Sequence, residues 1–422
     1  MPGSTRRFSA TSLVLLQRSL YEDKSFRAGL VDAAKSLPIG YAWDLKSKFG
    51  SLANPVGGAL KEALVSLRKG EEWALKPVVS ESNPHMLSPG ILWGVSQQSY
   101  CYRNELFGPV IGVMPFDTLD EAIRLVNETN YGLTSGLQSL DDREIARWRE
   151  GIRAGNLYIN RGTTGAIVMR QPFGGMAKSA IGPGIKVGGR NYPLEFTDVE
   201  EVGLPRNLSA SDPLLNRFEI MVESFPGGVD ETTTEQLQAA FESSIYEYEH
   251  VFSKIEDHFK IRGETNKSRY LKIHDITVRI EPEDSAFSIL SRLFNGFLSN
   301  TELTISVSLS VGEDLRTWLR LHAPDLKAKY VAEDQSDLCG RLRGIERIRF
   351  GSPEVVSDEL YAAAAQRGLY IASCPPLIDA RLELVLYFRE QCVTHCYHRY
   401  GNMGQHQLDP HALDALAPGA IV

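Results

Sequence analysis

Apolar and polar positions follow two different periods in the first half of the chain. Residues 25–37 and 119–127 carry apolar side chains at helical spacing. Residues 109–116 and 155–160 are short apolar runs with turn residues at both ends, which is typical of buried strands. The pattern predicts a layered α/β domain.

The second half begins with a long amphipathic stretch and continues as a regular α/β series. Residues 234–259 have apolar side chains at intervals of three and four, which predicts one long helix. Strands are then predicted at 278–280, 303–309, 347–350 and 369–372, and helices at 286–298, 315–321, 337–342, 357–367 and about 381–391. This alternation predicts a parallel, doubly wound sheet, so the second domain should be Rossmann-like.

A break in periodicity separates the two halves. Residues 203–213 are rich in Pro, Asn, Ser and Asp and fit neither period. We therefore place a domain boundary at about residue 205, with one domain over residues 1–205 and a second over residues 206–422. The total length of 422 residues agrees with roughly two or three domains.

Charge and cysteine content narrow the class of protein. The 45 Lys and Arg against 53 Asp and Glu give a net charge of −8, which does not favour binding to nucleic acid. No apolar run reaches the roughly 18–20 residues of a membrane span, and residues 13–16 are too few for a signal peptide. The five cysteines, an odd number, fit reduced thiols. We expect a cytoplasmic protein.

The Rossmann-like half lacks the motif that would make it a nucleotide site. No Gly-x-Gly-x-x-Gly follows any of its predicted strands, so the phosphate-binding turn is missing. Fold shape alone does not show nucleotide binding. We favour a structural or interface role for this domain, with nucleotide binding as the alternative.

A run of Cys and His near the C-terminus superficially suggests zinc. Cys392, His395, Cys396 and His398 form Cys-x-x-His-Cys-x-His, and on a helix the first three would share a face. Tetrahedral zinc sites usually take ligands from two separated pairs. We therefore predict no metal site and expect the histidines to serve in packing or at an interface.

Four motifs in order carry a family resemblance. They are Glu-Leu-Phe-Gly-Pro-Val at 105–110, Asn-Tyr-Gly-Leu-Thr-Ser-Gly at 130–136, Gly-Asn-Leu-Tyr-Ile-Asn at 155–160 and Arg-Gln-Pro-Phe-Gly-Gly-Met-Ala-Lys-Ser at 170–179. Together they resemble the C-terminal half of the NAD-dependent aldehyde dehydrogenases. Residues 160–173 and 182–192 are similar to one branch, the L-glutamate γ-semialdehyde (1-pyrroline-5-carboxylate) dehydrogenases of proline breakdown.

The resemblance extends through the second half of the chain. Residues 262–270 and 387–402 resemble the extra C-terminal domain of the long, bifunctional proline utilisation A (PutA) proteins. The implied architecture is an aldehyde dehydrogenase catalytic domain, which bears the nucleophile in the family, followed by a Rossmann-like domain.

The resemblance implies a place for NAD at the first motif. Glu105 would accept the hydroxyls of the nicotinamide ribose, and Phe107 would pack beside the nicotinamide ring. A surface or capping role for Glu105 and simple core packing for Phe107 are the alternatives.

The resemblance also implies a site for glutamate semialdehyde. Its α-amino carboxylate needs several inward-pointing donors. Gly165 and Ala166 could supply backbone N–H groups, Ser9 a hydroxyl and Phe173 an apolar wall. An ordinary glycine-containing turn is the alternative.

The chain departs from the family where the nucleophile should be. The family needs a cysteine whose thiolate adds to the aldehyde, and Phe8 occupies that place here. Cys101 is predicted to be a buried structural thiol and no substitute. The family's NAD-binding domain, general base and oxyanion-stabilising asparagine precede the nucleophile, and seven residues precede Phe8, so we expect a truncated chain.

Two hypotheses from different classes follow. In the first, the chain is a degenerate glutamate-semialdehyde dehydrogenase relative that is inactive alone. In the second, it is a non-catalytic interaction or oligomerisation module, acting as a homo-oligomer or with a complementing chain. Residues 192–202 alternate enough to form an exposed strand, and such strands invite pairing with another chain.

Overall fold

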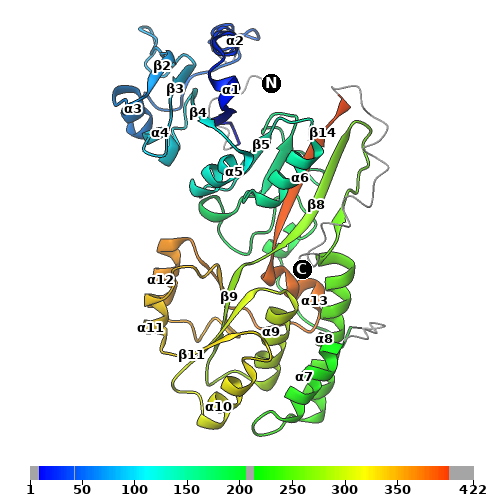
Figure 1. Cartoon of the computed structure of the whole chain (residues 1–422). Helices are drawn as coiled ribbons and strands as arrows, with labels where there is room; N and C mark the ends of the chain where they lie inside the picture. Colours follow the sequence, from blue (N-terminus) through cyan, green and yellow to red (C-terminus); the bar gives the residue numbers. More distant parts are fainter. Residues whose placement is uncertain (1–8, 42, 206–212, 399–422) are drawn as a thin grey trace. The chain divides into compact units, whose positions relative to one another are not determined.

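The computed structural model describes residues 9–41, 43–205 and 213–398 (Figure 1). The chain forms two compact units, Met1–Ala166 and Ile167–Val422, and each is described by itself. The domain boundary predicted near residue 205 adjoins residues 206–212, which lie outside the described residues, and stays a prediction. Within the described part of the chain, no helix combines the length and apolarity needed to cross a membrane.

A four-stranded sheet organises the first unit. Its order is β1-β4-β3-β2, with β1 (Leu13–Gln17), β4 (Val110–Phe116) and β3 (Gly90–Trp93) parallel and β2 (Glu72–Leu75) antiparallel to β3. The apolar run at residues 109–116 forms part of the core, and Val113 at the middle of β4 is fully buried. Outside this sheet, β5 (Thr134–Leu137) pairs parallel with β6 (Asn156–Ile159). The strands predicted at 109–116 and 155–160 correspond to β4 and β6.

Three helices of the first unit begin at residues whose side chains cap them. The helices of this unit are α1 (Arg18–Tyr21), α2 (Lys24–Lys35), α3 (Gly58–Val65), α4 (Tyr100–Arg103), α5 (Leu119–Glu128) and α6 (Asp142–Gly151). The side chains of Asp23, Thr118 and Asp141 accept hydrogen bonds from backbone N–H groups at the starts of α2, α5 and α6. The helices predicted at 25–37 and 119–127 correspond to α2 and α5.

The second unit contains the predicted parallel sheet. Its order is β11-β10-β9-β12-β13, and every neighbouring pair is parallel. The strands are β9 (Asp275–Ile280), β10 (Glu302–Val307), β11 (Lys329–Ala332), β12 (Arg347–Arg349) and β13 (Tyr370–Ala372). The order runs outward from β9 in both directions, which is the Rossmann-like arrangement. The predicted α/β fold class is confirmed.

Helices cover this sheet in two groups (Figure 1). Helices α8 (Glu231–Glu247) and α9 (Ala286–Leu298) share a buried cluster with β9 and β10, and α7 (Pro213–Glu223) and α10 (Glu313–His322) also contribute to it. Helices α11 (Gln335–Gly340) and α12 (Asp358–Arg367) share a second cluster with β12 and β13. Gly368 ends α12 in the left-handed conformation, with φ of 65°, as the sequence predicts.

The long helix predicted over 234–259 is wrong in its second part. Helix α8 ends at Glu247, a π-helical turn covers Tyr248–Phe252, and β7 (Ile255–Glu256) follows. Phe252 is buried and packs against the rings of Tyr270 and Phe388, at centroid distances of 4.5 and 5.1 Å. Tertiary packing therefore overrides the helical period.

The last helix, predicted at 381–391, is also wrong beyond its first turn. Helix α13 (Ala380–Glu383) is followed by a 3₁₀ turn (Leu384–Tyr387) and then by β14 (Phe388–Cys396). Strand β14 pairs antiparallel with β8 (Glu264–Lys272) over its whole length, and β7 pairs with the other edge of β8. Backbone pairing with a strand more than a hundred residues away cannot be read from local periodicity.

The exposed strand expected at residues 192–202 is absent from this part of the described chain. Tyr192–Phe196 is a 3₁₀ helix, and residues 197–202 have no regular structure. Pro193 explains the difference, because its fixed φ and missing N–H suit the first turn of a helix better than a strand ladder. Residues 192–202 therefore offer no exposed strand for pairing with another chain.

Candidate functional site

The predicted NAD contacts lie on the loop that joins α4 to β4. Leu106 anchors this loop in the core, while Phe107 is 50% exposed and has a φ of 48°. The Tyr131 hydroxyl accepts a hydrogen bond from the Glu105 backbone N–H at 3.1 Å. Burial raises the pKa of the Glu105 carboxyl above its usual value. The loop thus holds a half-buried carboxylate and an accessible ring two residues apart.

The structure brings Ser9 to the turn that contains Gly165. The Thr163 hydroxyl donates to the Ser9 carbonyl oxygen at 2.6 Å and lies 3.2 Å from the Thr11 hydroxyl. Gly165 has a φ of 83° and no bulky neighbour at its Cβ position. Three of the four residues predicted to bind the substrate, namely Ser9, Gly165 and Ala166, therefore belong to one local region.

Arg161 is a residue of this region that the sequence analysis missed. Its Nη2 donates to the Thr164 carbonyl oxygen at 3.1 Å and lies 4.0 Å from the Cβ position of Gly165. The guanidinium also lies over the ring of Tyr158, 5.1 Å from its centroid. A cation beside a small-residue turn suits a carboxylate ligand. In the sequence, Arg161 directly precedes the Gly-Thr-Thr-Gly segment, and this position could have indicated a role beside the turn.

Phe173 belongs to the second unit and is described there. It forms an isolated antiparallel bridge with Val187, in which the two residues exchange backbone hydrogen bonds of 3.0 and 2.9 Å. Its side chain is half-buried. The bridge gives this predicted apolar wall a defined backbone position.

The predicted nucleophile position, Phe8, lies outside the described residues. The five cysteines are all described, and all are free thiols. Burial raises the pKa of Cys101 to about 12, and its sulfur lies 3.1 Å from the Cβ position of Gly112. Burial also raises the pKa of Cys339, Cys374 and Cys392. A thiol with a raised pKa is a poor source of thiolate at neutral pH.

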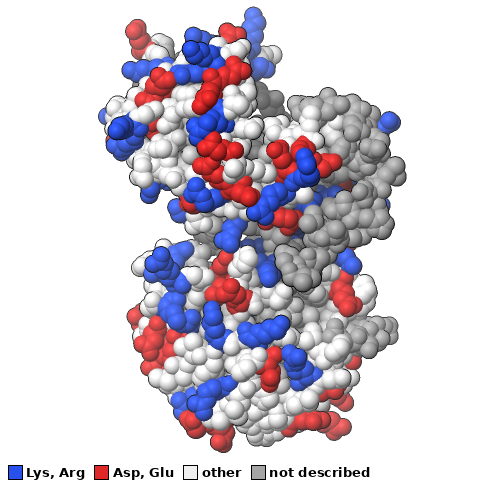
Figure 2. Space-filling model, in the orientation of Figure 1, with Lys and Arg blue, Asp and Glu red and all other residues white. Residues whose placement is uncertain are grey.

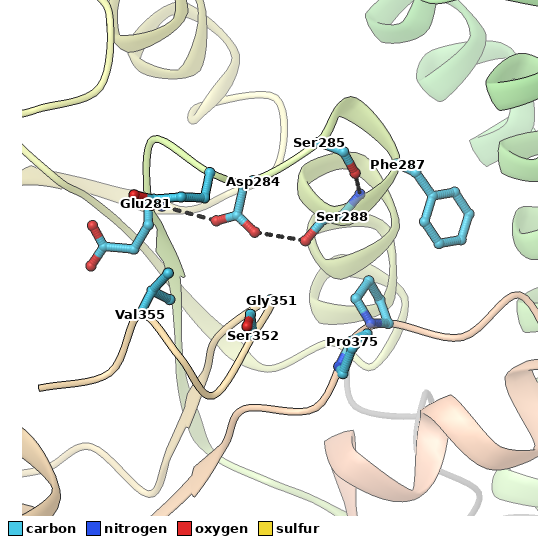
Figure 3. A pocket seen from close by; sticks show the side chains of 11 residues that line it. Glu281, Asp284, Ser285, Phe287, Ser288, Gly351, Ser352, Val355 and Pro375 are labelled. Carbon is cyan, nitrogen blue, oxygen red and sulfur yellow. Dashed lines mark hydrogen bonds between the residues drawn. The ribbon is translucent and has the colours of Figure 1, made fainter. Parts of the chain in front are cut away.

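A pocket of about 250 Å³ lies at the carboxyl ends of β9 and β12, where the strand order turns (Figure 3). In Rossmann-like folds this is where ligands bind. Here its wall is acidic and contains Glu281, Glu283 and Asp284. The Asp284 carboxylate forms a 2.6 Å ion pair with Arg292 and accepts hydrogen bonds from the Ser288 hydroxyl and the Glu281 N–H.

The pocket therefore does not suit a dinucleotide pyrophosphate. Asp284 lies next to the first turn of α9, where a phosphate would otherwise meet the helix N-terminus. A Cβ atom at Gly351 would come within 2.1 Å of the Asp284 carboxylate, so the chain packs tightly around it. Arg279 and Arg292 pair with Glu281 and Asp284 at 2.8 and 2.6 Å, and no Lys or Arg is among the residues that line this pocket, so its lining offers no side-chain cation to a phosphate. This geometry favours the structural role over nucleotide binding for the second domain.

The Cys and His run lies on a strand rather than on the helix assumed in the sequence analysis. On β14, Cys392 and Cys396 share one face and His395 lies on the other, because side chains alternate along a strand. The Cys396 thiol donates to Glu264 at 3.0 Å. Within residues 9–41, 43–205 and 213–398, no group of three His, Cys, Asp or Glu side chains is arranged to hold a metal ion.

Acidic and basic side chains are interspersed on the face shown in Figure 2. Many form exposed pairs, such as Arg147 with Asp120 at 2.7 Å and Arg143 with Asp141 at 2.7 Å. Exposed pairs of this kind contribute little stability.

Comparison with known proteins indicates the protein family of the first part of the chain. Residues 6–202 match the sequence model of the Aldehyde dehydrogenase family. The chain therefore contains an aldehyde dehydrogenase family domain, in agreement with the resemblance seen in the sequence.

Similar proteins narrow the comparison to one branch. The chain is 31% identical over 190 residues to 1-pyrroline-5-carboxylate dehydrogenase of Bacillus subtilis (strain 168). The aligned segment covers 45% of this chain and 36% of that protein. The chain is also 31% identical over 210 residues to the protein of the same name from Staphylococcus haemolyticus (strain JCSC1435), covering 47% and 38%. The chain thus spans little more than a third of the length of these relatives.

The structure of nearly the whole chain resembles part of a solved protein. Proline utilization A (PutA) from Corynebacterium freiburgense superposes with a TM-score of 0.71 at 29% identity, over 94% of this chain and 36% of that one. The similarity to PutA proteins predicted from the second half of the sequence is confirmed.

Proposed function

We propose that this chain is a glutamate-semialdehyde dehydrogenase relative that does not catalyse the oxidation by itself. The observation that carries the proposal is Phe8, which aligns in the sequence motif with the family's nucleophilic cysteine. A phenyl ring has no lone pair that could add to an aldehyde, so no covalent adduct forms from which hydride could pass to NAD.

The described cysteines support this proposal. A substitute nucleophile would have to be a thiolate near the aldehyde. Burial instead holds the pKa of Cys101 at about 12. The thiol of Cys374 is the most exposed of the five, and its pKa is also raised.

Binding without turnover remains part of the proposal. The turn with Gly165 and Ala166, the hydroxyl of Ser9 and the guanidinium of Arg161 would hold the α-amino carboxylate. Phe173, in the second unit, is the residue that the resemblance gives as an apolar wall. On the cofactor side, Glu105 and Phe107 offer the contacts that the family uses for NAD, but we expect two residues to give weak binding.

An absorbance assay of NADH formation from pyrroline-5-carboxylate and NAD tests the proposal. We expect no rate above that of a protein-free control. A rate that Glu105→Ala abolishes would show that this chain catalyses the reaction and would refute the proposal. The Arg147→Met variant, changed in an exposed ion pair, serves as the matched control.

A second candidate function is a non-catalytic interaction module, working as a homo-oligomer or with a complementing chain. It is favoured by the exposed apolar segment of the second unit that contains Ile167, Val168 and Met169, which are 47%, 71% and 46% exposed. Light scattering tests it: oligomers or a stable complex would support this function. Monomers alone, with and without a chain that carries the rest of the dehydrogenase, would count against it.

A further inference from the structure

Lys186 is a buried charged residue that the sequence analysis left without a role. Its side chain has no exposed surface. Burying an ammonium group is costly, and an apolar side chain of similar length would fill the same space without that cost. Such a residue is expected to have a specific polar task.

The ammonium group of Lys186 contacts the backbone beside Phe173. Its Nζ donates a hydrogen bond to the Gly174 carbonyl oxygen at 2.5 Å. The next residue, Val187, exchanges two backbone hydrogen bonds with Phe173. The side chain of Lys186 therefore holds Gly174, and the main chain of Val187 holds Phe173.

The backbone of Lys186 is fixed in turn by the second domain. Its N–H donates to the Glu390 carboxylate on β14 at 2.9 Å, and the other Glu390 oxygen accepts a hydrogen bond of 2.5 Å from Asn191. The side chain of Lys186 thus starts from an anchored backbone, so its reach to Gly174 defines where the turn at residues 173–176 lies.

We propose that Lys186 is a positioning residue that fixes the turn at residues 173–176 and, with it, the Phe173 wall of the semialdehyde site. This inference rests on the proposed function, in which Phe173 lines that site. Lys186 does not itself touch the ligand.

Burial shifts the pKa values of Lys186 and of the titratable groups around it, and it raises the pKa of the Glu390 carboxyl. Desolvation lowers the pKa of Lys186 to about 8, and Cys392 and Glu390 of β14 partly oppose that shift. Burial raises the pKa of Cys392 and of Tyr270, so both stay protonated there. Arg381 of α13 also faces Glu390. A neutral amine forms a weaker hydrogen bond than an ammonium group.

Hydrogen exchange and ligand titration on the full chain test the proposal. Lys186→Met should raise amide exchange in peptides that contain residues 173–176 by about tenfold, leave β9 and β10 unchanged, and weaken binding of the probe L-glutamate by about tenfold. Lys272→Met is the matched control, because the exposed Lys272 ammonium also donates to a backbone carbonyl, that of Asn300 at 2.9 Å. It should change neither quantity.

The outcomes separate this proposal from the proposed function. Unchanged exchange at 173–176 in Lys186→Met, or raised exchange with unchanged glutamate affinity, would overturn the role of Lys186. If the wild-type chain binds no glutamate, the proposed function fails, and the exchange result still decides whether Lys186 fixes the turn.

A wild-type measurement covers the case in which Lys186→Met does not fold. Exchange, corrected for intrinsic rates, is compared from about pH 7 to about pH 9.5. An opening that breaks the hydrogen bond to Gly174 while Lys186 stays buried becomes easier when the ammonium group loses its proton, so a rise confined to residues 173–176 with a midpoint near the pKa of Lys186, about 8, supports the proposal. Protection that stays constant across this range overturns it.

Discussion

At the scale of single residues, two side chains of unexpected chemical type define this protein. We propose that Phe8, whose side chain is an apolar ring, stands where the resemblance requires a nucleophile. Lys186 is a charged group where burial favours an apolar one. The first is visible in the sequence. The second is visible only once the structure shows that residue 186 has no exposed surface.

The stability of the chain should depend on pH through Lys186. Its pKa is lowered in the folded state to about 8 from 10.5, so the unfolded state binds more protons between these values and stability rises with pH across them. The rise should be on the order of 3 kcal/mol and should be missing in Lys186→Met. Urea unfolding at the two ends of this range, with Lys272→Met as the control, measures it. If the free energy of unfolding changes equally with pH in wild type and Lys186→Met, Lys186 does not titrate with a lowered pKa in the folded state.

Arg161 should matter for the affinity of a carboxylate ligand. Arg161→Met removes the guanidinium beside the Gly165 turn, and a charge-assisted hydrogen bond of about 1.5–3 kcal/mol corresponds to a loss of about tenfold or more. Calorimetric titration with L-glutamate measures the loss. Arg147→Met, in an exposed pair, should leave the affinity unchanged. An equal affinity in both variants would remove Arg161 from the site.

At the scale of elements, the sequence predicts those whose core contacts follow a local period. Strand β10 and helix α9 agree with their expected ranges within two residues, because alternation and helical spacing bury the same side chains that the pattern marks. Strand β14 was misread as a helix, since its pairing with β8 depends on residues far away in the chain. The candidate site follows the same rule: Gly165 is predicted from its motif, whereas the contacts of Arg161 and Lys186 are visible only in the structure.

The parallel sheet should depend strongly on one buried ion pair. Arg349 of β12 and Glu383 of α13 form a 2.9 Å pair with side chains 1% and 0% exposed. Arg349→Met leaves the Glu383 charge buried and should lower the free energy of unfolding by about 3–5 kcal/mol. Arg143→Met, in an exposed pair, should cost less than about 1 kcal/mol. Urea unfolding compares the two, and equal small losses would show that the pair is not essential.

At the scale of the whole molecule, an aldehyde dehydrogenase family domain over residues 6–202 is followed by a Rossmann-like sheet with an acidic pocket. The strand order alone would suggest a nucleotide domain. The carboxylates of Glu281, Glu283 and Asp284 at the turn of the sheet argue against it. The similarity to PutA over 94% of the chain shows that the two parts occur together in another protein.

Calorimetry with NAD tests the cofactor side of the account. Glu105 and Phe107 are the only NAD contacts we assign, and the lining of the pocket in the Rossmann-like domain includes no Lys or Arg to hold the pyrophosphate. We therefore expect little or no heat on titration of the chain with NAD. A saturable heat that Glu105→Ala removes would show that the first motif binds the cofactor. A heat that only Asp284→Ala alters would place NAD in the Rossmann-like domain.

A single-turnover experiment tests the central claim most directly. The chain, in excess over pyrroline-5-carboxylate, is mixed with saturating NAD, and the NADH formed per aldehyde is counted, so that slow product release cannot hide the chemistry. We predict no NADH above the protein-free control. Formation of NADH in proportion to the aldehyde would contradict the account, because it would require a nucleophile that Phe8 cannot provide.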